Sequence, residues 1–149
     1  MNRAPQEFRT YFVTTVTAQR LRLFQVEETA TLFLDVLQSQ REKRRMEIHA
    51  FVVMPDHVHL LLTPEPEVSL EKAMQFIKGG FSFRLKSKMD VWERSFNEVQ
   101  ILVPEKFRAC RTYIEENPIR DRLVSVAGDF PYGSLANPGM VDPVPSYLR

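Results

Sequence analysis

Two of the three histidines in this chain stand one residue apart, in the stretch FVVMPDHVHLLLTP at 51–64. Residues 46–54 and 57–63 read as two short strands around a Pro-Asp turn, so His57 and His59 point to the same face of the second strand. At the usual rise of a strand, their backbones lie about 7 Å apart. Two imidazoles on one face can converge on a metal ion or a phosphate. They can equally be partly buried sheet histidines with ordinary hydrogen bonds, so the pair needs a third partner to indicate a site.

Tyr113 and Asn117 are possible partners, because residues four apart on a helix share one face. The segment 104–117 has helical spacing of its apolar residues, with Pro104 at the favoured first position. Tyr113 is a possible nucleophile, and Asn117 at the expected helix end is a possible oxygen ligand for a hard cation. Two histidines and an amide oxygen would hold Mg²⁺ or Mn²⁺ and leave positions open for phosphate oxygens. The alternative for Tyr113 is a tyrosine that flanks the core with a hydrogen-bonded hydroxyl.

The elements that must position these residues form an α+β pattern. The second helix contains Gly79 and Gly80, which cost roughly 1 kcal/mol each relative to alanine and predict a bend or a close approach. The element order predicts a ferredoxin-like βαββαβ antiparallel sheet with an added C-terminal tyrosine helix. Both crossover helices should pack on one face of this sheet. We expect strands at about 9–18, 46–54, 57–63 and 91–102, and helices at about 26–45, 69–89 and 104–117.

Composition indicates one globular domain without a membrane span. The 149 residues are 44% hydrophobic and 26% charged, and no apolar stretch approaches the roughly 18 residues that a span needs. The first ten residues, MNRAPQEFRT, lack the apolar region of a signal peptide, so a cytoplasmic location is expected. The single cysteine, Cys110, excludes an internal disulfide and is expected to be an inert helix residue. The net charge is only +1, but basic residues gather in 41–45 and 72–94.

The motifs in order resemble one family. MPDHVHLLL at 54–62 followed by YIEENPIRDRLV at 113–124 resembles the single-tyrosine HUH transposases, in particular the REP-associated tyrosine transposases and their insertion-sequence relatives. In HUH, U is a bulky apolar residue, here Val58 between the two histidines. FPYGS at 130–134 is similar to an aromatic-Pro-aromatic stretch that follows the tyrosine helix in these proteins. The resemblance runs from about Thr10 to Ser134. It implies a catalytic domain at 1–134 and leaves 135–149 as an extended tail containing Pro and Gly.

The resemblance implies metal-dependent nicking and strand transfer on single-stranded or hairpin DNA through a 5′-phosphotyrosine intermediate. Tyr113 would be the nucleophile, and His57, His59 and Asn117 would hold Mg²⁺ or Mn²⁺. DNA phosphates would contact basic side chains, and aromatic residues such as Phe81, Phe83 and Trp92 could stack on bases or belong to the core. A bacterial, nucleoid-associated location follows from the same resemblance. The basic residues expected to bind DNA are Lys78, Arg84, Lys86 and Arg120.

Two other functions stay open at this point. The chain could be a catalytically idle single-stranded DNA- or RNA-binding module on the same fold. It could also be a small structural metal-binding protein that uses His49, His57 and His59, although His49 lies outside the motif and is expected to be structural. The molecule could work as a monomer or a homodimer, and the short join at Leu102–Val103 favours a tyrosine that acts within its own chain.

Overall fold

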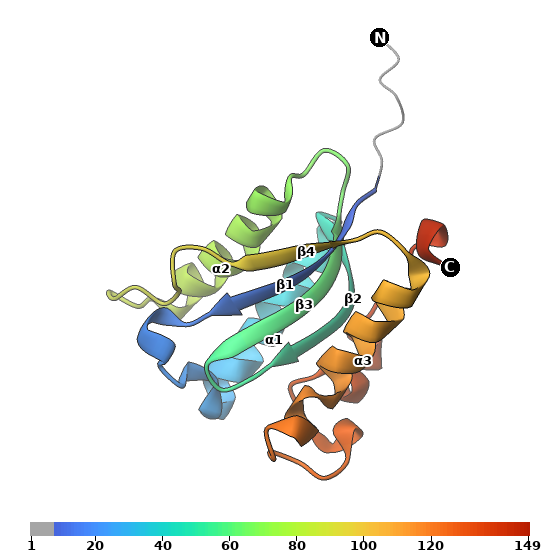
Figure 1. Cartoon of the computed structure of the whole chain (residues 1–149). Helices are drawn as coiled ribbons and strands as arrows, with labels where there is room; N and C mark the ends of the chain where they lie inside the picture. The colour runs from blue at the N-terminus through green and yellow to red at the C-terminus, as the bar shows by residue number, and fades with distance from the viewer. Residues whose placement is uncertain (1–7) are drawn as a thin grey trace.

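The structure is a computed structural model and describes residues 8–149. The prediction about a signal peptide concerned residues 1–10, most of which lie outside the described residues. The predicted element order is confirmed (Figure 1). The strands are β1 (Thr10–Val16), β2 (Met46–Val53), β3 (His57–Pro64) and β4 (Asn97–Ile101), and the helices are α1 (Glu27–Glu42), α2 (Leu70–Leu85) and α3 (Pro104–Arg120).

The strands form one antiparallel sheet in the order β2-β3-β1-β4. Helices α1 and α2 lie together against one face, as expected, and α3 crosses the other face (Figure 1). Because side chains alternate along a strand, each central strand feeds both layers. On β1, Val13 enters the core under α1 and α2, while Phe12 packs toward α3. The histidines of β3 therefore lie on the face that carries the tyrosine helix.

An aromatic cluster fills the space under α1 and α2. Phe24, Phe33, Phe81 and Trp92 stack with ring centroids 5.4–5.9 Å apart. Such pairs add to the burial of their apolar area. The α3 layer is smaller and places apolar side chains of one helix face, including Phe107 and Ile114, against β2 and β3.

Several elements differ in length from the prediction; helix α1, for example, ends at Glu42 rather than at 45. The expected strand 91–102 is a regular strand only at Asn97–Ile101; Trp92 forms an isolated bridge with Thr17, and residues 94–96 between the two paired parts are irregular. The second helix ends at Leu85 rather than at 89. Helix α3 continues beyond its expected end at residue 117, through Pro118 to Arg120. Ser69 caps α2, accepting a hydrogen bond from the backbone N–H of Lys72 at 3.1 Å.

The segment after α3 folds back along the outer edge of β2. Val53 N–H donates to the carbonyl of Tyr132 at 2.9 Å, and Asp142 N–H donates to the carbonyl of Ile48 at 2.7 Å. The Asp142 carboxylate also accepts two hydrogen bonds from Arg41, at 2.9 Å each, and one from Ile48 N–H at 2.8 Å. Residues 132–142 therefore occupy hydrogen-bonding groups of β2 that an edge strand would otherwise present to solvent.

A β-bulge at residue 49 adjusts β2 to this arrangement. Ile48 pairs with Leu62 and Ala50 with Leu61, so His49 is the extra residue. Its ring is buried on the α3 side, with Nε2 2.7 Å from Thr63 Oγ1 and Nδ1 3.3 Å from the carbonyl oxygen of Asp142. Both ring nitrogens thus have protein partners, as a structural histidine requires.

Across residues 8–149, no helix has the length and apolar character needed to cross a bilayer.

Candidate active site

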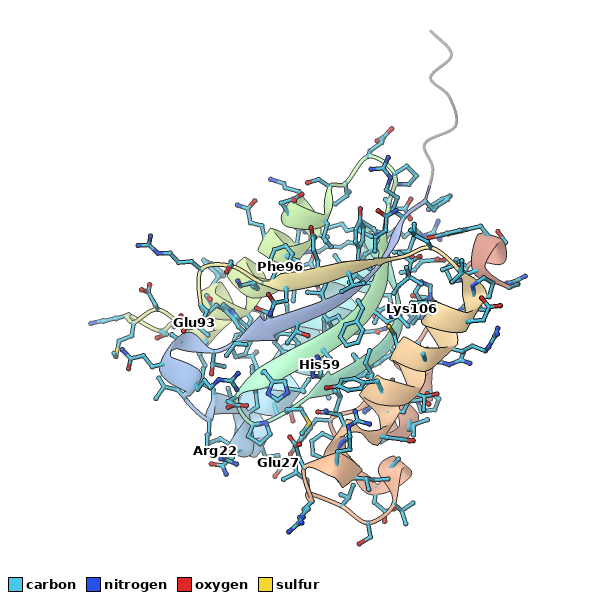
Figure 2. The ribbon with its side chains drawn as sticks, viewed as in Figure 1. Arg22, Glu27, His59, Glu93, Phe96 and Lys106 are labelled. Atoms are coloured by element: carbon cyan, nitrogen blue, oxygen red, sulfur yellow. The ribbon has the colours of Figure 1, made fainter. Side chains whose placement is uncertain are left out.

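His59 lies in the centre of the sheet, on the face that α3 crosses (Figure 2). It is 7% exposed, and its Nδ1 lies 2.8 Å from the hydroxyl of Thr14, its register partner on β1. In the tautomer in which Nδ1–H donates to the Thr14 hydroxyl, Nε2 keeps its lone pair for another partner. Burial, with smaller contributions from His57 and Arg120, lowers the pKa of His59 from 6.5 to about 3. The ring is therefore neutral near pH 7, which is the form that binds a metal.

His57 is held on the same face by an acidic neighbour. The two imidazole centroids are 4.8 Å apart, and His57 Nδ1–H donates to Asp56 Oδ1 at 2.7 Å. Arg20 contacts the other carboxylate oxygen at 3.2 Å. Burial would raise the pKa of Asp56, but the hydrogen bonds from His57 and Arg20 outweigh it and leave this pKa below its ordinary value. A carboxylate behind a histidine is the usual support of a metal ligand, because it fixes the ring and leaves Nε2 available.

The turn that carries Asp56 is clamped by the connection between β1 and α1. Thr17 donates both its backbone N–H and its hydroxyl to the Asp56 carbonyl, at 3.0 Å each. Phe24 N–H donates to the Pro55 carbonyl at 3.0 Å. The connection contains Gln19 and Arg20 with φ of 55° and 53°, a conformation that non-glycine residues adopt only when their surroundings impose it. The orientation of His57 is thus set by a segment almost forty positions earlier in the chain.

Tyr113 presents its ring to the histidines from α3. Its ring centroid is 5.6 Å from that of His59 and 5.8 Å from that of Phe12, and the residue is 43% exposed. Among the described residues, its hydroxyl has no hydrogen-bond partner. The predicted alternative of a bonded core-flank tyrosine therefore does not fit this side chain. The Arg120 guanidinium lies 4.0 Å from the Tyr113 ring centroid and donates to the Tyr113 carbonyl.

Asn117 lies one helical turn beyond Tyr113 on the same face of α3. The sequence placed it at the helix end, but it lies inside the helix and is 5% exposed. Its side-chain oxygen Oδ1 is buried without a hydrogen-bond partner in the described structure. An unpaired buried acceptor costs about 1–3 kcal/mol. Asn117 shares a helix face with Tyr113, whose ring contacts His59, so an oxygen kept in this state fits a cation and the donor set is suited to a divalent metal.

The alternative site of three histidines is not formed. His49 is engaged with Thr63 and the Asp142 carbonyl, as described above. Nor do three or more His, Cys, Asp or Glu side chains gather as a metal site anywhere in residues 8–149. Beside His57 and His59, a third donor would have to be another oxygen, and the buried, unpaired Oδ1 of Asn117 is a candidate. Cys110 is buried, and burial raises the pKa of its thiol, which agrees with an inert residue.

The four residues predicted to contact DNA divide into two pairs. Arg84 and Lys86 are exposed at the end of α2. Lys78 is partly buried and donates to the Glu93 carbonyl at 3.0 Å, and burial lowers its pKa. Arg120 stacks on Tyr113 instead of projecting into solvent alone.

Asp56, Thr14 and Arg20 are site residues that the sequence did not reveal. Asp56 had a visible signal, because it directly precedes the histidine pair, but it was interpreted only as a turn residue. Thr14 reaches His59 only through the register of β1 on β3, and Arg20 reaches Asp56 only through an ion pair between distant segments. Neither residue could therefore be recognised from its neighbours in the sequence.

Comparisons with known proteins point to one family. The family described as "Transposase IS200 like" matches residues 8–117. A Haemophilus influenzae protein named as a REP-associated tyrosine transposase is 25% identical over 139 residues, covering 84% of this chain and 78% of that protein. The ISDra2 transposase TnpA of Deinococcus radiodurans is 32% identical over 101 residues, covering 60% of this chain and 71% of the relative.

Two solved structures have similar folds. The structure of a REP-associated tyrosine transposase bound to a REP hairpin superposes with a TM-score of 0.75 at 23% identity, covering 100% of this chain and 94% of that one. A crystal structure described as a transposase from Deinococcus radiodurans has a TM-score of 0.58 at 25% identity, covering 78% and 95% of the two chains.

Proposed function

Because the chain belongs to the IS200-like transposase family, we propose that it nicks and rejoins single-stranded DNA through a covalent bond to Tyr113. The observation that carries this proposal is the exposed Tyr113 phenol, with its hydroxyl unpartnered, directly beside the buried and neutral His59. A residue kept only for packing would bury its ring or bond its hydroxyl. Tyrosine and histidines belong to the same chain here, so we propose that one molecule contains a whole site.

In the proposed reaction, the Tyr113 hydroxyl attacks the phosphorus of a DNA phosphodiester. The bond from the phenolic oxygen to phosphorus forms as the bond to the 3′-oxygen breaks, and the phenolic proton is balanced by the proton gained at the released 3′-hydroxyl. The 5′ end stays on the tyrosine. Attack by another 3′-hydroxyl reverses the step and joins the strands, so the bond energy is kept without a nucleotide cofactor.

The other residues bind and orient. His57 and His59, through Nε2, and Asn117, through Oδ1, are the residues that would hold a divalent cation, for which we propose Mg²⁺ or Mn²⁺. Such an ion supplies charge neutralisation at the scissile phosphate. Asp56 and Thr14 keep the two imidazoles in the required orientation. Arg120 covers one face of the Tyr113 ring and holds the carbonyl of the same residue, which restricts the rotation of the nucleophile.

For the substrate, we propose a DNA hairpin with single-stranded flanks. A protein of similar fold is bound to a REP hairpin, and the exposed basic residues Arg84 and Lys86 at the end of α2 suit a phosphate backbone. The same basic residues would also serve the idle binding module, so binding alone does not separate the two functions. Covalent chemistry does.

The test is an adduct assay on single-stranded DNA hairpins taken from the gene's own genomic neighbourhood, with Mg²⁺ or Mn²⁺. We expect a denaturant-resistant DNA–protein adduct that is absent in Tyr113→Phe and His57→Ala. Tyr147→Phe is the matched control, because Tyr147 is similarly exposed at 46% but its hydroxyl bonds Thr10 at 2.5 Å, away from the histidines. Adduct formation by Tyr113→Phe, or DNA binding by all proteins with no adduct in any, would refute the proposed enzyme and favour the binding module.

A further inference from the structure

Phe83 is the most exposed large apolar side chain in the described part of the chain, at 83%. It belongs to α2, yet Phe81, two positions earlier, is fully buried in the aromatic cluster. The sequence left open whether these aromatics stack on bases or fill the core, and the structure separates them. Phe83 contributes nothing to the core that would explain a large apolar group at this position.

Gly79 lies one helical turn before Phe83, on the same exposed side of α2. A methyl group added at Gly80 would lie 3.3 Å from Val36 Cγ1, so close packing of α2 on α1 explains that glycine. A methyl group added at Gly79 would have nothing within 4 Å. Glycine is one of the least favourable residues in a helix interior, so internal packing gives no reason for Gly79. Close approach of another molecule to the helix backbone would give one.

The charge of this surface selects its partner. From Lys72 to Lys88 the sequence has five basic residues and no acidic one. Arg84 and Lys86 flank Phe83 and are exposed. An aromatic ring among cations, with a bare helix backbone beside it, is suited to a strand whose phosphates contact the cations while a base stacks on the ring.

The residues that follow α2 line a hollow together with the connection between β1 and α1. This hollow, of about 900 Å³, is lined by Lys88 and Met89 and by Gln19 and Leu21, from the connection that clamps the Asp56 turn. The hollow also includes Glu93, whose backbone N–H donates to the Val16 carbonyl at 2.9 Å, and Val16 is the register partner of His57. The hollow therefore lies beside both the segment that follows α2 and the connection that holds the Asp56 turn.

We propose that Phe83 stacks on an unpaired base of single-stranded DNA whose backbone passes over Gly79. This inference rests on the proposed function and adds a contact for the substrate outside the site that holds Tyr113. The ring supplies stacking, Gly79 supplies clearance, and Arg84 and Lys86 supply charge.

The first test measures binding of a DNA hairpin with single-stranded flanks by fluorescence anisotropy at fixed salt. Phe83→Ala should weaken binding about tenfold, the range for loss of one stacked base, while Phe83→Trp should keep it. The matched control is Leu102→Ala, because Leu102 is 72% exposed but lies between β4 and α3. Phe83→Ala should leave the salt dependence of Kd unchanged, whereas Lys86→Ala should reduce its slope by about one. A 2-aminopurine probe placed at successive unpaired positions should lose its quenching in Phe83→Ala at one position.

The second test uses the opposite effects expected at Gly79. Gly79→Ala should raise Tm by about 2–4 °C, because it improves helix propensity without a clash, and should weaken DNA binding severalfold. Gly80→Ala is the control, and its tight contact with Val36 should cancel any gain in Tm. Together, the higher Tm and the weaker binding at Gly79 would support a surface kept for a partner.

The two proposals fail in different ways. If wild type forms the Tyr113 adduct while Phe83→Ala and Gly79→Ala bind DNA as wild type does, the stacking contact is overturned and the proposed function stands. If wild type neither binds the hairpin nor forms an adduct, both are overturned. If Phe83→Ala weakens binding equally for a blunt, fully paired duplex, the ring contacts DNA without stacking on an unpaired base, and this inference is overturned.

Discussion

The buried His59 should make the stability of the metal-free protein fall as the pH drops below neutrality. Its pKa is about 3 in the folded chain, against an ordinary value of 6.5. The unfolded chain therefore binds a proton at His59 below pH 6.5 while the folded chain does not, and acid favours unfolding. Relative to neutral pH, this proton binding lowers the free energy of unfolding by about 2 kcal/mol at pH 5. Below pH 3 the loss approaches about 5 kcal/mol. Above pH 7 the effect disappears.

The measurement is urea unfolding in EDTA at pH 7.5, 6 and 5, for wild type and for His59→Gln. Between pH 7.5 and 5, wild type should lose about 2 kcal/mol more of its free energy of unfolding than His59→Gln. Burial also lowers the pKa of His49, but that contribution is common to both proteins and cancels. If the two proteins lose equal stability, or if NMR shows the His59 ring titrating near pH 6.5, then the ring is solvated and the reasoning about a neutral, buried ligand is refuted.

Three further predictions concern single side chains. Asn117→Leu removes the unpaired Oδ1, so the metal-free protein should be as stable as wild type or up to about 2 kcal/mol more stable, and calorimetry should detect no Mn²⁺ binding. A loss of stability with normal Mn²⁺ binding would contradict this. Arg120→Leu should slow adduct formation about tenfold at saturating DNA, with little change in Kd, because a cation–π contact on Tyr113 is lost; a weaker Kd with a smaller salt slope would instead make Arg120 a phosphate contact. Asp142→Ala should lower the free energy of unfolding by about 2 kcal/mol in urea titrations, because Arg41 and Ile48 N–H lose a shared, mostly buried acceptor. A loss below about 0.5 kcal/mol would show that the tail contributes little to stability.

Local patterns in the sequence were sufficient to predict the helices and strands and the faces on which the candidate site residues lie. Strand alternation placed His57 and His59 on one face, and the rings are indeed adjacent. Helical spacing placed Tyr113 and Asn117 together on α3. Both inferences depend only on repeats of two and of 3.6 residues, which hold wherever the element forms. The roles of these residues as nucleophile and ligands stay predictions.

Contacts between distant segments were beyond the sequence. The support of His59 by Thr14 requires the register of two strands, and the support of Asp56 by Arg20 requires the path of a connection with left-handed residues. Pro118 illustrates a local rule that tertiary structure overrides. Its missing N–H removes one hydrogen bond close to the helix end, and α3 continues for two more residues to Arg120, whose side chain reaches back to the Tyr113 carbonyl.

The segment that folds back on β2 also limits how many molecules could share one sheet. With the outer edge of β2 occupied by residues 132–142, β4 is the edge of this sheet whose outer groups face away from any described strand. Two copies that met through β4 would each present an occupied edge on the far side, so the combined sheet would end at two chains. Asp142 and its neighbours therefore prevent further chains from adding to such a sheet through β2. If this segment were detached, the outer edge of β2 would be free to pair with a strand of another molecule.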